Sequence, residues 1–219
     1  LGKVFRENGE VTSVGEPLVD YCPIFDKIDD AKHLTPEFIK WNIEKRIREF
    51  GMCTPQRVVR MKDFLSFGIS EILKTNVELG LIDCVVGVCD GIGTLLMMEP
   101  EIIQGVGGRV SALVSTTPIP EVIEQVGVEN AVNPETAQLT PIKGLEMAIE
   151  NGYKNIAITI LPGEIIKEIA QYPLPEDVNV YIFVAHTTNA SDEEVEIAFN
   201  YADVITACAS SKVRDFAEK

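Results

Sequence analysis

The chain has 219 residues, of which 46% are hydrophobic and 24% charged, so it is long enough and apolar enough to bury a substantial core. Its 34 acidic and 19 basic residues leave a formal net charge of -15, which repels phosphate backbones and anionic lipid and argues against nucleic acid as a partner. No apolar run is long enough to span a bilayer, so we expect no membrane partner and predict a cytoplasmic protein.

The first residues predict a β-hairpin. Two short alternating runs in "KVFRENGEVTSVGE" surround Asn8 and Gly9, which accept the positive backbone dihedrals of a tight turn. A helix is then expected from Pro36 to Gly51, because Thr35 can cap it and apolar residues recur at helical spacing between these limits.

A second helical pattern follows Pro55 and runs to Gly80, with Gly68 as a weak point. We expect the two helices to pack against each other and against the sheet. Residues 1–80 are therefore predicted to form a hairpin and helical cap, and residues 81–219 an α/β body.

The body alternates apolar strands with helical stretches. The predicted strands are "IDCVVGVC", "RVSALVST" (109–116), "NIAITI", "NVYIFVAH" and "DVITACA". The helices between them are "PEIIQGVGG", "PIPEVIEQVG", "PIKGLEMAIENG", "PGEIIKEIA" and "SDEEVEIAFNYA". Continuous apolarity in the strands indicates burial on both faces, and helical crossovers suit parallel pairing. The predicted fold is α/β, a three-layer, mostly parallel, Rossmann-like sheet with an N-terminal β-hairpin and helical cap.

Ligands of open parallel sheets bind beyond the carboxyl ends of the strands, so the site is expected among the strand exits. These exits are rich in glycine and hydroxyl residues, which admit a ligand closely and donate hydrogen bonds, and Arg109 is the nearest obvious cation. The alternative is that such residues only form caps and turns. The candidate cofactor-binding residues are Asp90, Gly91, Gly93, Thr94, Arg109, Ser115, Thr116, Thr117, His186, Thr187 and Ser210.

The five cysteines are odd in number and widely spaced, which is typical of a reduced intracellular protein, and they contain no CxxC pair. If the cap folds over the sheet edge, four of them converge on zinc or an iron–sulfur cluster, with Cys84 inside a strand. Ordinary buried thiols, or a nucleophilic Cys89 with His186 as base and Asp90 as orienting group, remain alternatives. The predicted metal ligands are Cys22, Cys53, Cys89 and Cys208.

Several long segments resemble a known family. They are "YCPIF", "FGMCTPQRVVRMKDFLSFGISEIL", "VCDGIGT", "IQGVGGRVSALVSTTPIPEVIE", "AHTT" and "YADVITACAS". These motifs are similar to those of methanogenesis marker protein 8, an archaeal domain family of unknown function. The resemblance implies a cytoplasmic archaeal protein linked to methanogenesis, without an established activity. The four candidate cysteines lie inside the matching segments.

Three functions are compatible with these patterns, and whether the protein is an enzyme stays open. The first is a metal or iron–sulfur protein that assists maturation or activation of a methanogenic enzyme or its cofactor. The second is a small-molecule enzyme that binds an anionic coenzyme or phosphate ester at the carboxyl edge of the sheet. The third is a non-enzymatic adaptor. A homo-oligomer is compatible with each of them.

Overall fold

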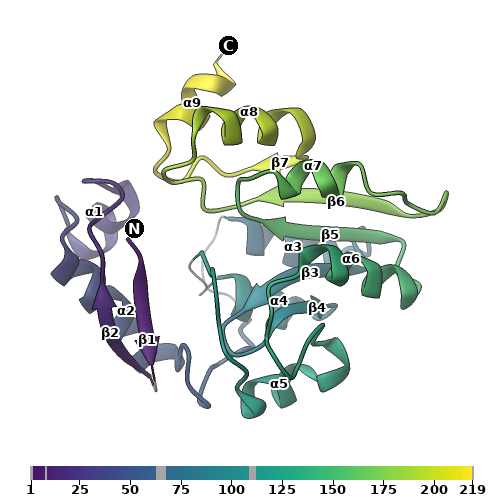
Figure 1. Ribbon diagram of the computed structural model, residues 1–219, viewed down its shortest axis with the longest axis horizontal. Helices are drawn as coiled ribbons and strands as arrows, with labels where there is room; N and C mark the ends of the chain where they lie inside the picture. The colour runs from purple at the N-terminus through teal and green to yellow at the C-terminus, as the bar shows by residue number, and fades with distance from the viewer. Residues whose placement is uncertain (1, 8, 63–67, 109–111, 219) are drawn as a thin grey trace.

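The computed structural model describes residues 2–7, 9–62, 68–108 and 112–218. It combines an N-terminal hairpin with an α/β body on a five-stranded sheet (Figure 1). The strands are β1 (Val4–Glu7), β2 (Glu10–Val14), β3 (Cys84–Cys89), β4 (Gly93–Met97), β5 (Asn155–Ile160), β6 (Asn179–Val184) and β7 (Val204–Ile205). The helices are α1 (Pro23–Asp29), α2 (Pro36–Phe50), α3 (Ile69–Glu78), α4 (Pro100–Gly107), α5 (Pro120–Val126), α6 (Pro141–Glu150), α7 (Ile165–Ala170), α8 (Asp192–Tyr201) and α9 (Ser211–Ala217), with a 3-10 turn η1 (Val128–Asn130).

The hairpin, α1 and α2 together form what we call the N-terminal unit, residues 2–50. Strands β1 and β2 pair antiparallel, which confirms the predicted hairpin, although Asn8 of its turn lies outside the described residues. The helix α2 confirms the second prediction: the Thr35 hydroxyl accepts the Phe38 amide at 3.2 Å, and Gly51 ends the helix at φ 65°.

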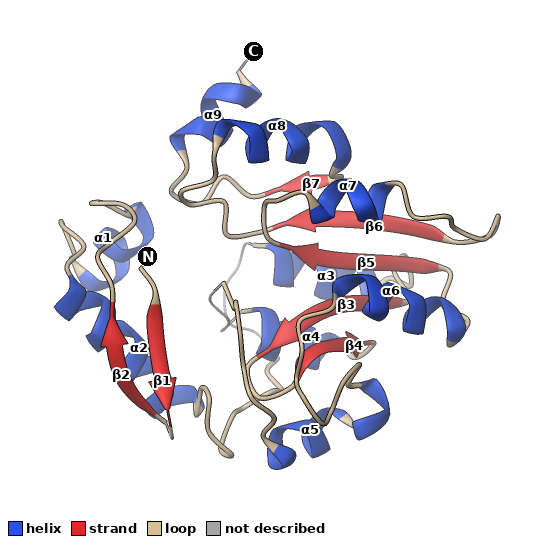
Figure 2. Ribbon diagram, viewed as in Figure 1, coloured by secondary structure: helices blue, strands red, loops and turns tan. Residues whose placement is uncertain are grey.

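The body has three layers, as its apolar strands predict. The sheet order is β4-β3-β5-β6-β7, in which β3, β5, β6 and β7 are parallel and β4 is an antiparallel edge strand (Figure 2). Side chains alternate across β3: Val85 and Cys89 enter the core beneath α3, α4 and α5, whereas Cys84 and Val86 enter the core beneath α6, α7 and α8. Within the described part of the chain, no helix is long and apolar enough to cross a membrane.

One predicted strand is wrong and one strand was missed. Residues 109–111 of the expected strand lie outside the described residues, and residues 112–119 contain no strand. The fifth strand is instead β4, which returns antiparallel from β3 with Cys89 opposite Gly93. The stretch "CDGIGT" is therefore a hairpin turn, and its Asp-Gly dipeptide is a strong hairpin signal that the strand-to-helix interpretation overlooked.

The second predicted helix is correct only in its last part. Helix α3 begins after Gly68, whereas residues 51–62 form turns and irregular chain, and residues 63–67 lie outside the described residues. In this connector, residues 51–62, Val59 is buried at 1% exposure and its carbonyl passes so close to Gly105 that a Cβ there would lie 2.3 Å away. Tertiary packing thus overrides the helical pattern.

Contrary to the prediction, the described parts of the two helices do not pack on each other. Helix α2 packs on the hairpin, and α3 packs on α4, where Ser70 faces Gly107. The side chain of Leu73 on α3 joins the core beneath the sheet. The division of the chain at residue 80 stays a prediction.

Candidate anion-binding site

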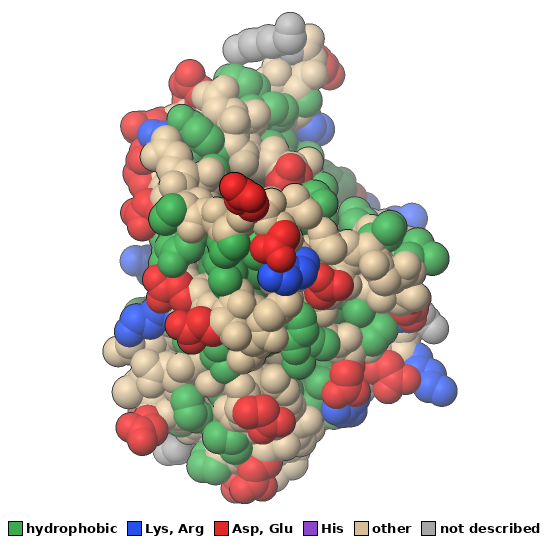
Figure 3. Space-filling view, turned by 90° about the vertical axis from the view of Figure 1, so that its right-hand side faces the viewer, with side chains coloured by type: hydrophobic (Ala, Val, Ile, Leu, Met, Phe, Trp, Pro, Cys, Tyr) green, Lys and Arg blue, Asp and Glu red, His purple; other side chains and the backbone are tan. Residues whose placement is uncertain are grey.

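The N-terminal unit faces the carboxyl edge of the parallel strands. In Figure 2 the arrowheads of β3, β5 and β6 point toward the hairpin β1–β2, so the loops that leave these strands lie on the side of the N-terminal unit. This is the edge at which open α/β sheets bind ligands. The opposite side, where the parallel strands begin, carries scattered acidic and basic side chains (Figure 3).

Cys89 and Asp90, at the end of β3, are buried at 0% and 1% exposure. The Asp90 carboxylate accepts the Cys53 amide and the Arg57 Nε, the latter at 3.1 Å, and the Cys89 sulfur lies 3.9 Å from its Oδ1. No hydrogen bond joins Asp90 to His186 among the described residues, so the predicted Cys89, His186 and Asp90 arrangement is not formed. Asp90 instead anchors the connector to the sheet.

Arg57 is the ion-pair partner of Asp90, and the sequence did not reveal it. Its side chain is fully buried, donates Nη1 to the Val58 carbonyl and Nη2 to the Gly105 carbonyl, the latter at 3.3 Å, and thereby ties the connector to α4. Burial disfavours its charge, but the neighbouring Cys89 and Asp90 outweigh this cost and raise the pKa of Arg57. The Arg57 guanidinium therefore remains charged at neutral pH.

Four of the predicted hydroxyl residues make hydrogen bonds to the backbone, three of them to residues distant in sequence. Thr116 accepts the Gly91 amide at 2.9 Å, and Thr94 accepts the Thr140 amide at 2.8 Å. The Thr187 hydroxyl donates to the Thr206 carbonyl at 2.6 Å, which joins the loop after β6 to the loop after β7. The Ser210 hydroxyl caps α9.

The remaining candidate cofactor-binding residues lie in turns, on the surface or outside the described residues. Gly91 and Gly93 hold φ values of 84° and 79°, and a Cβ on Gly93 would lie 2.4 Å from the Ala137 carbonyl. Ser115 and Thr117 are exposed. Arg109 lies outside the described residues.

The four candidate metal ligands do not converge. Cys22 is buried just before α1 and Cys208 is exposed after β7. Three strand spacings, roughly 14 Å, separate β3 from β7, whereas two sulfurs on one zinc ion lie no more than about 4.6 Å apart. Within the residues described, no group of three or more His, Cys, Asp and Glu side chains is arranged to hold a metal ion.

Cys53 and Cys89 do lie near one another, on either side of Asp90. Burial, together with the Asp90 carboxylate, raises the pKa of Cys53 to about 12 and raises that of Cys89 further. Both thiols are therefore protonated at neutral pH in this structure. A protonated thiol is a weak nucleophile and a weak metal ligand.

Two arginines and a histidine interact electrostatically where the N-terminal unit meets the sheet edge. We call Arg6 of β1, Arg46 of α2 and His186 after β6 the cationic cluster; all three are half-buried. Burial and then the Arg46 charge lower the pKa of His186 to about 4. Burial and then the Arg6 charge lower the pKa of Arg46, while Asp29 acts in the opposite direction.

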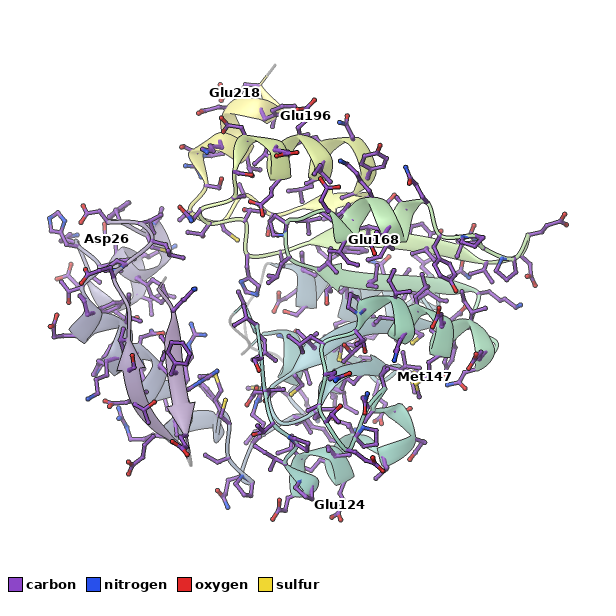
Figure 4. The ribbon with its side chains drawn as sticks, viewed as in Figure 1. Asp26, Glu124, Met147, Glu168, Glu196 and Glu218 are labelled. Atoms are coloured by element: carbon purple, nitrogen blue, oxygen red, sulfur yellow. The ribbon has the colours of Figure 1, made fainter. Side chains whose placement is uncertain are left out.

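Two carboxylates near the cationic cluster form ion pairs with cations outside it. Asp29 forms an ion pair with Lys45 at 3.2 Å, and Asp90 pairs with Arg57. Acidic side chains labelled in Figure 4, such as Glu124, Glu196 and Glu218, lie at the periphery instead. The cationic cluster thus brings the charges of Arg6 and Arg46 within electrostatic reach of each other in a protein of net charge -15.

The backbone around this edge is strained at several residues. Cys53 in the connector, His186 and Asn189 after β6, and Cys208 after β7 hold left-handed φ values of 59°, 57°, 66° and 44°. Non-glycine residues in this conformation cost free energy and gather at functional sites. The strain agrees with a site at the carboxyl edge.

Sequence reasoning identified His186 but missed Arg6 and Arg46. A signal for Arg46 exists, because it falls on the same stripe of the helix as Ile39 and Ile43, both buried. A charge on an apolar stripe needs a polar partner or a ligand. Arg6, in a short alternating strand, offers no comparable signal.

Fold and site together define a three-layer α/β protein whose N-terminal unit faces the carboxyl edge of the sheet and contributes cations there. The chain belongs to the archaeal family described as "Uncharacterized protein conserved in archaea (DUF2099)", which matches residues 1–219. It is 40% identical over 220 residues to "Uncharacterized protein MJ0054" of Methanocaldococcus jannaschii, an alignment that covers 98% of this chain and 77% of that relative. No solved structure matches the chain. Membership of an archaeal family without an established activity is therefore confirmed, whereas the resemblance to methanogenesis marker protein 8 and a link to methanogenesis stay predictions.

Proposed function

We propose that this protein binds a small anionic ligand, a carboxylate or a phosphate ester, at the cationic cluster. One observation carries the proposal: Arg6, Arg46 and His186 come from three separate elements, and Arg46 interacts electrostatically with both Arg6 and His186 at the carboxyl edge of a parallel sheet. Guanidinium groups bind carboxylates and phosphates with strong, often bidentate hydrogen bonds. This corresponds to the anion-binding alternative drawn from the sequence.

The electrostatics of the cluster favour an anion. Arg6 and Arg46 lie close enough for the charge of one to disfavour the charge of the other, and an anion between them converts this repulsion into attraction. His186 is neutral at pH 7, so one ring nitrogen can donate a hydrogen bond to the ligand. Binding of an anion beside it raises its pKa, which predicts proton uptake on binding below neutral pH.

A ligand screen with a matched pair of variants tests the proposal. Arg46→Met keeps the aliphatic stem and removes the charge, while Arg48→Met makes the same change at an exposed position of α2. Inorganic phosphate, nucleotides, dicarboxylates and methanogenic coenzymes are screened by thermal shift. A ligand at 100 times its Kd stabilises the native protein by about 2.7 kcal/mol.

We expect one class of anion to stabilise the wild-type protein and Arg48→Met, and to leave Arg46→Met unchanged. A wild-type protein that responds to none of these anions contradicts the proposal. So does a response that Arg46→Met retains in full.

The finer functions drawn from the sequence stay predictions. A role in methanogenesis rests on the motif resemblance and serves here to choose the coenzymes of the screen. The metal or iron–sulfur role in maturation has no support from the positions of Cys89 and Cys208, and iron and sulfide analysis of protein purified without oxygen tests it. An adaptor role predicts that Arg46→Met leaves capture of a protein partner unchanged.

A further inference from the structure

The last strand of the sheet borders an apolar groove. Strand β7 ends the sheet order β4-β3-β5-β6-β7, and no further strand pairs with its outer side in the described part of the chain. Figure 1 shows α8 and α9 beside β7, at the end of the sheet opposite β4. These elements enclose a groove of about 390 Å³, whose apolar lining includes Phe199, Ile205, Val213 and Ala217.

The floor of the groove is held in place by core contacts. Val213 is buried at 4% exposure in a small core cluster on which Phe199, Ile205 and Ala207 pack. The Phe199 ring also packs on the Phe216 ring, with the ring centroids 4.7 Å apart. Because these side chains are already ordered, a partner that binds here pays little entropy to order them. The groove therefore offers a preorganised apolar surface.

Two residues of opposite charge, Asp203 and Arg214, also line the groove. Both are exposed, and each makes a hydrogen bond to the backbone. The Asp203 carboxylate accepts the Ile182 amide at 2.7 Å, and Arg214 Nη1 donates to the Cys208 carbonyl at 3.4 Å. No ion pair joins the two side chains to each other, although they belong to the same groove. Both charges are thus available to a partner.

A groove that carries both signs of charge is complementary to a second copy of itself. In a two-fold dimer the same surface of both subunits forms the interface, so every contact between two different residues occurs twice. Asp203 of one copy then faces Arg214 of the second, and the reverse, around an apolar centre. A uniformly acidic or basic peptide would instead place like charge against one of the two residues.

We infer that the groove binds a second copy of this chain in a two-fold dimer, in which Asp203 of each copy forms an ion pair with Arg214 of the other. This arrangement covers the open end of the sheet, where an unpaired strand edge invites aggregation. The net charge of -15 on each copy opposes association, so apolar burial and the two ion pairs must outweigh this repulsion. The dimer is separate from the cationic cluster, because none of its three residues lines the groove.

Sedimentation velocity on the full chain, over a range of protein concentrations, tests the dimer. A salt concentration of about 0.15 M gives a screening length of about 8 Å, which reduces the net repulsion and leaves short ion pairs less affected. We expect the wild-type protein to dimerise. Arg214→Glu and Asp203→Lys each place like charges together at both contacts and should weaken the dimer by about 10-fold or more. The control Arg48→Glu reverses an exposed charge on α2 and should leave the dimer unchanged.

Mixing the two charge-reversed variants distinguishes a lost contact from a damaged fold. In a dimer of one Arg214→Glu chain and one Asp203→Lys chain, the two changed residues face each other and the two unchanged residues face each other. Both contacts then join opposite charges. An equimolar mixture should therefore recover the dimer that each variant alone has lost, which damage to either fold would prevent.

Three results overturn the inference. The first is a wild-type protein that stays monomeric at every concentration, which leaves the groove to a peptide or a small ligand. The second is a dimer that both variants retain, because the interface then lies elsewhere. The third is a mixture of two folded variants that stays monomeric.

Asp203→Lys loses the hydrogen bond to the Ile182 amide, so circular dichroism and Tm establish first that this variant is folded. If it is not, Ala217→Arg replaces it. Ala217 is exposed and lines the groove, so the longer side chain obstructs the second copy and leaves the core contacts of the floor in place. Ala217→Arg and Arg214→Glu must then both weaken the dimer, and a dimer that either of them leaves unchanged contradicts the inference.

Discussion

Removing the charge of Asp90 tests the role of the buried ion pair. The side chains of Arg57 and Asp90 are 0% and 2% exposed and joined by an Nε–Oδ1 contact of 3.1 Å. In Asp90→Asn the guanidinium stays buried without its carboxylate, and breaking such a pair costs about 3–5 kcal/mol. For a chain of this size about 1 kcal/mol shifts Tm by roughly 2–4 °C, so we expect Tm to fall by about 6–20 °C.

Double-mutant analysis separates the pair from its surroundings. Arg57→Met leaves the carboxylate buried and should be comparably destabilising, whereas the double variant removes both charges. Because each single change strands the other charge, we expect the double variant to lose less free energy of unfolding than the sum of the single variants, by about 1–3 kcal/mol. Urea unfolding monitored by circular dichroism measures these free energies.

An exposed ion pair of the same connector provides the control. Arg60 Nη2 donates to Glu99 Oε1 at 2.8 Å, but the two side chains are 45% and 56% exposed. Glu99→Gln should therefore cost no more than about 1 kcal/mol. If Asp90→Asn costs no more than Glu99→Gln, or if the double variant is additive, the buried pair does not anchor the connector as described.

Two further predictions concern pH and the tight turn after β3. The pKa of His186 falls from 6.5 in the unfolded chain to about 4 in the folded protein, so the unfolded state binds more protons and stability should decrease as pH falls from 6.5 toward 4. In urea unfolding, His186→Gln should flatten this dependence, whereas the same change at the exposed His33 should not; equal slopes for both variants would contradict the burial of His186. Gly93→Ala should destabilise by about 1–3 kcal/mol, because φ is 79° and the new Cβ would lie 2.4 Å from the Ala137 carbonyl. At Gly152, where φ is 86° and nothing lies within 4 Å, the same change should cost only about 1 kcal/mol, and equal losses at the two sites would show that the close contact is relieved.

Local patterns determined much of this fold. The cap at Thr35 and the glycine at Gly51 set both ends of α2, because capping chemistry acts within one turn of the chain. Ser191 caps the N-terminus of α8 in a capping box with Glu194, which lies in the acidic stretch predicted as a helix N-terminus. Continuous apolar strands predicted burial on both faces, and hence the three layers.

Long-range contacts decided the rest. The connector has a helical pattern, yet Arg57 reaches Asp90 and Val59 enters the core, and no local propensity matches the free energy of these contacts. The turn after Cys89 follows an Asp-Gly signal that is visible in the sequence, but the antiparallel return of β4 depends on an open edge of the sheet. The strand order then placed Cys89 and Cys208 three strands apart, which spacing along the chain cannot reveal.

The candidate site shows the same division. The sequence alone predicted a site at the carboxyl edge and placed His186 at this edge, because strand direction follows from the crossovers. Only the tertiary structure decided that Arg6 and Arg46 join His186, since their meeting depends on how the N-terminal unit packs against the sheet. Residues far apart in the chain become neighbours through packing, and packing is a property of the whole folded molecule.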